Sequence, residues 1–219
     1  MIKNIHQILF DFDYTLADSS EGIITCVNFA LEKVGAPPGQ PDAIRRMIGH
    51  SLENTFARFI DPSDTEKIQT CKSLFMEHAD TGAMVRNTVM LDGVRETLEF
   101  LYNELYTLGI VSTKRRSTIW ETLIEKEMDD FFDIVIGYED VTHLKPHPEG
   151  LIKAIEELAG TPETTIYIGD SPLDIKAAKS ANVFVVAVTS GMHSTDELAT
   201  LNPDLIIPRL SDLKAHLAA

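Results

Sequence analysis

The stretch "ILFDFDYTLADSS", residues 8–20, places two acids directly after an apolar run and decides the expected fold. The run from Ile8 to Phe10 is typical of a buried strand, and Asp11 and Asp13 follow it. Ligands of an open α/β sheet bind beyond the carboxyl ends of its strands. Residues two apart in a strand point to the same side. We therefore expect both carboxylates to face a single site at this edge of a sheet.

Similar short apolar runs recur along the chain and alternate with segments of helical periodicity. Short runs bounded in this way are typical of buried parallel strands. The expected strands are residues 8–10, 109–111, 134–136, 165–168, 183–188 and 205–207. The expected helices between them are residues 94–106, 119–126, 149–158 and 173–180. This alternation predicts an α/β fold, a Rossmann-like, doubly wound parallel sheet.

One region interrupts the alternation, because residues 21–79 contain helical patterns and no strand signal. The expected helices there are residues 23–34, 43–47, 52–60 and 65–78. The last of these follows a capping-box pattern at residues 63–66, which predicts a helix that begins after Pro62. We therefore predict an all-helical cap domain over residues 18–87, inserted into a catalytic core of residues 1–17 and 88–219.

Composition narrows the classes of partner. The chain has 219 residues, 44% hydrophobic and 24% charged, and a formal net charge of -15, which repels nucleic acids and anionic membrane surfaces. An anionic substrate must then be met by local positive groups. The two cysteines, Cys26 and Cys71, lack the spacing of a metal or disulfide framework, so we expect buried free thiols. Without a signal-peptide pattern or a long apolar run, we expect a cytoplasmic protein, a monomer or a homodimer, with no nucleic-acid or membrane partner.

Polar residues also follow the other expected strands. The second strand is followed by Ser112, Thr113 and Lys114, and the fourth by Asp170 and Asp174, while the segment "HLKPHP" supplies Lys145. Carboxylates gathered at one edge repel each other unless a cation lies among them. Oxygen ligands without histidine or cysteine suit Mg²⁺. With Mg²⁺ and a lysine as positive partners, a carboxylate could attack a phosphoryl group.

Four segments, "DFDYTLADS", "VSTK", "LKPHP" and "IGDSPLD", occur in the order and spacing of the four motifs of the haloacid dehalogenase superfamily, which the chain resembles over essentially its whole length. The resemblance is closest to phosphoglycolate phosphatases and β-phosphoglucomutase-like phosphatases, which carry a helical cap after the first motif. It implies a Mg²⁺-dependent phosphatase that acts on a small phosphorylated metabolite, a phosphate monoester such as phosphoglycolate, through an aspartyl-phosphate.

The resemblance also implies a role for each matching residue. Asp11 would be the nucleophile and Asp13 the general acid and base. Lys145 would hold the nucleophile and the phosphate. Ser112 and Thr113 would bind the phosphoryl group, and Thr15 would shape the turn beside it. The metal would be held by Asp11, by the backbone carbonyl of Asp13 and by Asp170, with Asp174 in support.

Some positions depart from the motifs or invite a second interpretation. Tyr14 stands where the family usually has glycine, so its ring is expected over the crevice, and His147 stands where a small or acidic residue is common. Asp174 also fits a helix cap begun by Ser171. The basic residues 114–116 are expected to form a solvated helix start.

In the cap, Arg45, Arg46 and His50 flank Gly49, in a loop from which we expect substrate contacts, with Arg46 and Gly49 as the predicted phosphate-binding pair. Three other functions stay open. A phosphomutase would keep every core residue and differ only in the cap. A 2-haloacid dehalogenase would need no metal and lack the second acid. A catalytically silent binding protein would lack at least one of the core residues.

Overall fold

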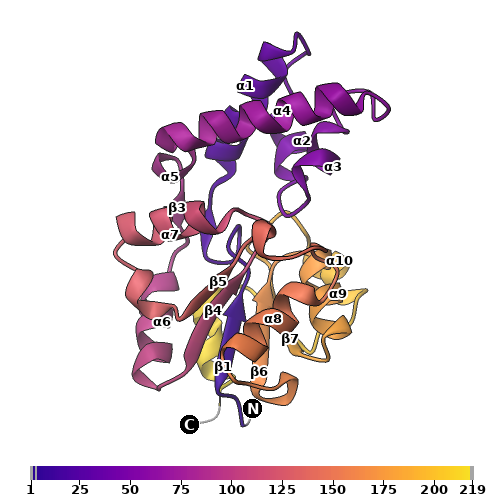
Figure 1. Cartoon of the computed structure of the whole chain (residues 1–219). Helices are drawn as coiled ribbons and strands as arrows, with labels where there is room; N and C mark the ends of the chain where they lie inside the picture. The colour runs from indigo at the N-terminus through magenta and orange to yellow at the C-terminus, as the bar shows by residue number, and fades with distance from the viewer. Residues whose placement is uncertain (1, 3, 218–219) are drawn as a thin grey trace. The chain divides into compact units, whose positions relative to one another are not determined.

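The computed structural model describes residue 2 and residues 4–217 of the chain. The chain forms two compact units, Met1–Ala17 with Met90–Ala219, and Asp18–Val89. The first unit is an α/β core, and the second is helical (Figure 1). None of the described helices is long and apolar enough to cross a membrane.

The core unit is built on a six-stranded sheet in the order β5-β4-β1-β6-β7-β8, and every pairing in it is parallel. The strands are β1 (Gln7–Phe10), β4 (Thr107–Val111), β5 (Ile134–Ile136), β6 (Thr165–Gly169), β7 (Phe184–Val188) and β8 (Leu205–Ile207). Their ends differ from the expected ones by at most two residues. The predicted doubly wound α/β fold is confirmed.

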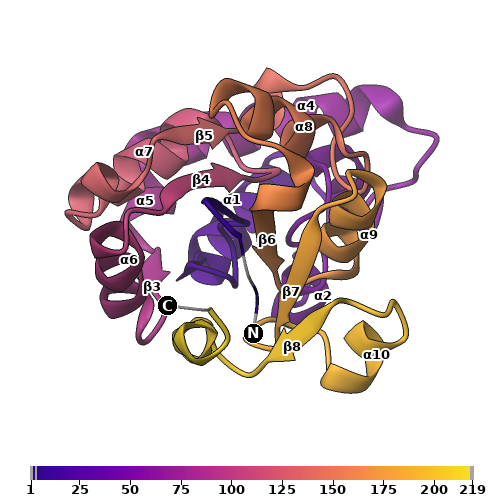
Figure 2. The same ribbon diagram turned by 90° about the horizontal axis from the view of Figure 1, so that it is seen from below.

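Helices cover both faces of this sheet (Figure 2). One face packs against α6 (Val94–Asn103), α7 (Arg116–Glu125) and the 3-10 helix Leu210–Ala215, and the other against α8 (Glu149–Glu157), α9 (Pro172–Ser180) and α10 (Thr195–Ala199). Further 3-10 turns are Asp129–Phe131, Tyr138–Asp140 and Pro162–Thr164.

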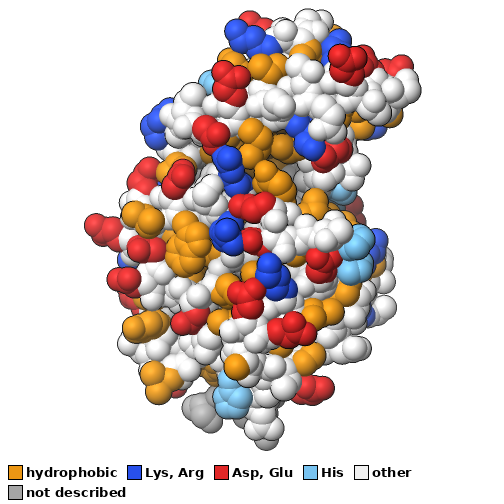
Figure 3. Space-filling view, in the orientation of Figure 1, with side chains coloured by type: hydrophobic (Ala, Val, Ile, Leu, Met, Phe, Trp, Pro, Cys, Tyr) orange, Lys and Arg blue, Asp and Glu red, His pale blue; other side chains and the backbone are white. Residues whose placement is uncertain are grey.

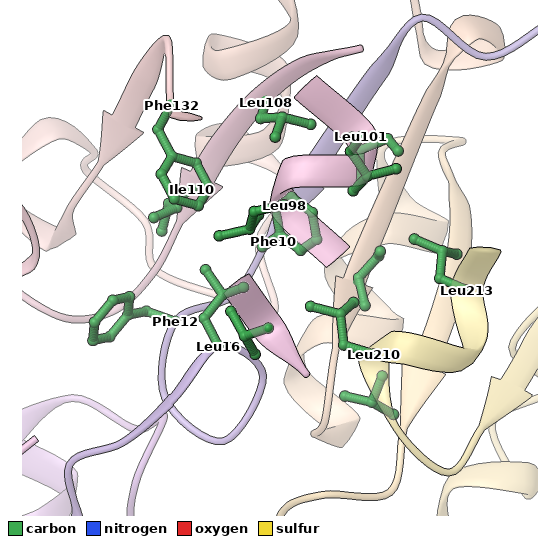
Figure 4. Close-up of a cluster of buried hydrophobic side chains, with 14 of the residues drawn as sticks. Phe10, Phe12, Leu16, Leu98, Leu101, Leu108, Ile110, Phe132, Leu210 and Leu213 are labelled. Carbon is green, nitrogen blue, oxygen red and sulfur yellow. The ribbon is translucent and has the colours of Figure 1, made fainter. Parts of the chain in front are cut away.

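Alternation along the central strands divides the core into two apolar layers. Ile8 and Phe10 of β1 point to the layer of α6 and α7, and Leu9 points to the layer of α8 and α9. Figure 4 shows Phe10 among Leu98, Leu101 and other side chains of the first layer. Since both faces are covered, the strands read as continuous apolar runs, and only their ends are free to present polar groups.

The helical unit has an apolar core of its own. Its helices are α1 (Ser20–Lys33), α2 (Pro41–Arg45), α3 (Leu52–Phe56), α4 (Thr65–His78) and α5 (Met84–Arg86), with a π turn at Ala79–Ala83. Cys26 and Cys71 are buried free thiols, as predicted. The cap of α4 differs from the expectation, because Asp64 rather than Ser63 is the N-cap and its side chain accepts a hydrogen bond from Lys67 N.

Two short strands, β2 (Ala17–Asp18) and β3 (Val89–Met90), form a separate two-stranded sheet where the chain passes between the units. Strands of two residues have no detectable periodicity, so the sequence did not predict them. On the face shown in Figure 3, acidic side chains are spread among basic ones. The negative net charge is therefore not concentrated in one patch on that face.

Candidate active site

The sheet register brings the motif residues to one edge. Phe10 of β1 is level with Ile110 of β4 and Ile168 of β6. Asp11 follows this level, and its backbone N–H donates to Ile168 O at 2.8 Å. The residues that next leave the sheet at this edge include Ser112 after β4 and Asp170 after β6, which is the arrangement expected from parallel strands.

Lys145 is the centre of a buried ionic network. Its Nζ lies 2.9 Å from Asp11 Oδ1 and 2.7 Å from Asp174 Oδ1, and the three side chains are at most 5% exposed. The ammonium also donates to the hydroxyl of Tyr167 at 2.9 Å. The peptide bond between Lys145 and Pro146 is cis. The structure thus places the predicted lysine beside the predicted nucleophile.

Tyr167 is a member of this network that sequence reasoning missed. It is a fully buried residue of β6, and its hydroxyl lies 2.9 Å from Val111 O and 3.0 Å from Asp174 Oδ1. Burial, followed by the charges of Asp174 and Asp11, raises the pKa of Tyr167 well above its ordinary value, so the hydroxyl keeps its proton. In the sequence this position looks like any aromatic residue of a strand.

Asp174 caps α9, as predicted, and it also contacts the lysine network, whereas its support of a metal stays a prediction. Its Oδ2 accepts hydrogen bonds from Ser171 N at 3.0 Å and Ser171 Oγ at 2.6 Å, which completes a capping box at the start of α9. Its Oδ1 faces Lys145 and Tyr167. The helix cap therefore fixes the carboxylate that holds the lysine. Gly169 makes this possible, because a Cβ there would lie 2.4 Å from the Asp174 carboxyl carbon.

Asp11, Asp170 and Asp174 form an acidic cluster, in which one oxygen of each carboxylate lies within 4.8 Å of the others. All three are buried. Gly191 leaves room for the Asp170 side chain, since a Cβ on Gly191 would lie 1.9 Å from the Asp170 Oδ2 atom. Glycine at 191 is a second feature that the sequence patterns did not reveal.

The electrostatics of the acidic cluster favour a bound cation. Burial raises the pKa of Asp11 from 3.8 to about 6, despite the opposing attraction of Lys145. Burial and the charges of Asp174 and Asp11 raise the pKa of Asp170 well above its ordinary value. The same carboxylates outweigh the effect of burial on Lys145 and raise its pKa. One ammonium is too little positive charge for three buried carboxylates.

The donor set fits Mg²⁺. It consists of carboxylate oxygens, the ligand type that this hard cation prefers. Oδ1 of Asp11 is buried and, within the described part of the chain, accepts no well-aligned hydrogen bond, although the lysine lies at ion-pair distance. That oxygen keeps a lone pair for an ion. Asp11, Asp170 and Asp174 are therefore the residues that would hold the metal.

Asp13 pairs with a lysine that was expected to be solvated. Lys114 Nζ lies 3.0 and 3.1 Å from the two carboxylate oxygens of Asp13, and the two side chains are 8% and 10% exposed. The expectation of a solvated helix start at residues 114–116 is thus wrong for Lys114. The reason is that Lys114 follows β4, which pairs with β1, and its side chain reaches the carboxylate of Asp13 just after β1. Arg116, by contrast, is half-exposed and pairs with Asp140.

The turn after β1 holds Tyr14 in a left-handed conformation, with φ 59°. This conformation costs a non-glycine residue ~1–2 kcal/mol. Tyr14 is 8% exposed as a residue. Its backbone N–H donates to Ala17 O, and its carbonyl accepts from Ser190 Oγ. Thr15 is buried in the same turn.

A small open recess lies beside the lysine network. Ser112, Thr113, His143 and Lys145 are among its lining residues, so the predicted phosphate-binding residues of the core share one recess with the lysine. Arg46 and Gly49 belong to the helical unit. There Arg46 is the C-cap residue that follows α2, and Gly49 has φ 92°, and their contact with substrate stays a prediction.

Comparison with known proteins agrees with this arrangement. Residues 8–188 match the family model described as haloacid dehalogenase-like hydrolase. The pyrophosphatase PpaX of Bacillus mycoides (strain KBAB4) is 36% identical over 95% of both chains, and PpaX of Bacillus anthracis is 34% identical over 95% of this chain and 94% of its own.

Solved structures show the same relationship. A haloacid dehalogenase-like hydrolase from Bacteroides fragilis is 42% identical with a TM-score of 0.91, covering 95% of this chain and 99% of its own. A predicted phosphoglycolate phosphatase from Haemophilus somnus is 25% identical with a TM-score of 0.88, covering 99% and 100%. With a family model that spans most of the chain and a relative above 30% identity, this protein belongs to the haloacid dehalogenase-like hydrolase family.

Proposed function

We propose that the protein is a Mg²⁺-dependent phosphatase that removes a phosphoryl group from a small phosphorylated metabolite through an aspartyl-phosphate on Asp11. The observation that carries the proposal is the buried ion pair of Asp11 and Lys145 beside Asp170 and Asp174. A buried carboxylate held by an ammonium is a positioned nucleophile, and phosphoryl transfer depends mainly on positioning and on neutralising charge.

In the first half of the reaction, an Asp11 oxygen attacks phosphorus while the bond from phosphorus to the leaving oxygen breaks. Asp13, in its protonated form, gives its proton to the leaving oxygen. The Lys145 ammonium keeps Asp11 in place and faces the negative phosphoryl oxygens, to which Ser112 and Thr113 donate hydrogen bonds. Bound Mg²⁺ would neutralise charge on the carboxylates and the phosphoryl group.

In the second half, the Asp13 carboxylate takes a proton from a water molecule, whose oxygen attacks phosphorus and releases phosphate from Asp11. Asp13 returns to its protonated form and Asp11 to its carboxylate, so the cycle closes without a further reactant. Lys114 contacts Asp13 and thereby fixes the side chain that moves protons in both halves.

Two substrates have specific support. The motif resemblance and a structural relative named as a predicted phosphoglycolate phosphatase support a phosphate monoester such as phosphoglycolate. The PpaX relatives are named as pyrophosphatases and support inorganic pyrophosphate. Both are small anions with a transferable phosphoryl group. A metal-free 2-haloacid dehalogenase activity has less support, because that reaction would use neither Asp13 nor a metal held by the acidic cluster.

A direct test measures phosphate release from phosphoglycolate and from pyrophosphate, with Mg²⁺ and with excess EDTA. We expect turnover of at least one substrate with Mg²⁺ and its loss in EDTA. In the same assay Asp11→Asn should remove turnover while circular dichroism shows an intact fold, because no other group can supply the attacking oxygen. Full activity in EDTA, or a mutant within about tenfold of the native rate, ~1.4 kcal/mol of barrier, would refute the proposal.

A further inference from the structure

A second group of potential metal ligands lies outside the acidic cluster, in the loop after β5 and at the first residue of α8. It consists of His143, His147 and Glu149, called here the histidine cluster. One ligand atom of each residue lies within 4.8 Å of the others. His143 Nδ1 is 2.9 Å and His147 Nδ1 is 3.9 Å from the same oxygen, Glu149 Oε2. The two imidazole rings are 4.6 Å apart between centroids and tilted by 35°.

The Glu149 carboxylate is held in place before any ion arrives. The backbone N–H of Thr142 donates to Oε1 at 2.7 Å, and that of His143 donates to Oε2 at 2.9 Å. Metal-binding carboxylates are commonly oriented by such hydrogen bonds. A carboxylate has about four acceptor sites, and the two amides leave room for an ion.

Both imidazoles contact Glu149. His147 Nδ1 accepts the Glu149 N–H at 3.2 Å, so in the neutral ring this nitrogen is unprotonated, and an ion that binds it would displace the Glu149 N–H. His143 Nδ1 contacts Glu149 Oε2. The proton in that contact is the one that a metal ion would replace. The side chains of His143 and His147 are 62% and 51% exposed, so an ion can enter from solvent.

We propose that His143, His147 and Glu149 bind a borderline transition-metal ion, of which Zn²⁺ is the probe, with water completing the coordination. Two imidazoles and a carboxylate are ligands for Zn²⁺, Co²⁺ or Ni²⁺, whereas Mg²⁺ prefers the oxygen-only acidic cluster. The two sites therefore differ in the metal that they select. His143 and His147 stand two residues before and two after Lys145, so the ion would fasten the loop that carries the lysine. The inference does not depend on the proposed function.

The test is a calorimetric titration of the full chain with Zn²⁺ in a large excess of Mg²⁺, which fills the acidic cluster. The variants are His143→Gln and His147→Gln, and the matched control is His6→Gln, an exposed histidine outside the cluster. A parallel titration uses Asp170→Asn, which alters the acidic cluster alone. Co²⁺ absorption in the visible range reports imidazole ligation independently of heat.

We expect one Zn²⁺ per chain in the native protein, in His6→Gln and in Asp170→Asn. Each cluster variant should bind at least about tenfold more weakly, since losing even an outer partner of a ligand costs about 10–100-fold. The inference is overturned by the absence of Zn²⁺ binding in the native protein. It is equally overturned if both cluster variants bind like the native chain, or if Asp170→Asn alone removes binding.

Discussion

The Tyr167 hydroxyl joins three groups of the lysine network, since it contacts Lys145, Asp174 and Val111 O. Tyr167→Phe removes only this oxygen from a packed strand. A buried group that loses its partner costs ~1–3 kcal/mol, and here the loss falls on the lysine that aligns the nucleophile. We expect kcat to fall about tenfold with KM nearly unchanged, measured in the phosphate-release assay.

The matched control for this change is Tyr102→Phe, which removes a hydroxyl from a tyrosine that is 54% exposed. It should leave kcat unchanged. If Tyr167→Phe lowers the melting temperature and leaves kcat per folded molecule at the native value, the hydroxyl has only a structural role.

Asp11 gives the metal-free protein a distinctive dependence of stability on pH. Its pKa is 3.8 ordinarily and about 6 in the folded state, so between these values the folded state retains a proton that the unfolded state has lost. Stability from this group is therefore present at low pH and is lost as pH rises through about 6. A shift of this size corresponds to on the order of 3 kcal/mol.

Urea unfolding of the native protein and of Asp11→Asn, both in EDTA, measures this contribution. We expect the variant to gain stability relative to the native protein between pH 4 and pH 7.5, because asparagine cannot acquire the buried charge. A stability difference that is constant across this range would show that Asp11 ionises as easily as in the unfolded chain.

Both α9 and α10 begin with a capping box, but only the box at α9 includes a residue of the lysine network. Ser171 bonds Asp174 of the lysine network, and Ser194 bonds Glu197 on an exposed helix. Replacing either serine by alanine should cost ~1 kcal/mol of unfolding free energy. Only Ser171→Ala should also lower phosphatase activity, because it releases the carboxylate that orients Lys145. Equal activity of both variants would show that the box at α9 is only a helix stop.

The elements of the core were predictable because both faces of the sheet are covered. Six apolar runs between helical patterns left little choice of fold, and their boundaries in the structure are close to the expected ones. The contacts of Lys114 and Tyr167 were not predictable in this way. The contact of Lys114 depends on the conformation of the chain after β4. The contacts of Tyr167 depend on a single hydroxyl on an otherwise apolar strand. Hydrophobic patterns contain neither piece of information.

The division of the chain into two units suggests a division of labour. The core unit carries the acidic cluster and the lysine, and the helical unit carries Arg46 and Gly49. We expect Arg46→Ala to change the ratio of rates between phosphoglycolate and pyrophosphate. Asp170→Asn should depress both rates together, because it alters the proposed metal site. Initial rates on a panel of phosphate compounds measure both effects.

Arg58→Ala is the control within the helical unit, as this arginine is exposed and lies after α3. This variant should keep the native ratio of the rates on phosphoglycolate and pyrophosphate. If Arg46→Ala changes the rate on every substrate by the same factor, the helical unit does not select the substrate through this residue. The motifs locate the core residues well, whereas residues of the helical unit depend on a loop conformation that no motif fixes.

The pairing of β2 with β3 has a consequence for how this protein could be rebuilt. Because the two strands are hydrogen-bonded neighbours, the chain leaves the core and returns to it at nearly the same place. Residues 18–89 are thus a cassette with adjacent ends, and a short loop from Ala17 to Met90 could replace them without stretching the sheet. Helical units of other sizes could be exchanged at the same junction, and a new specificity could be grafted while the catalytic core stays untouched.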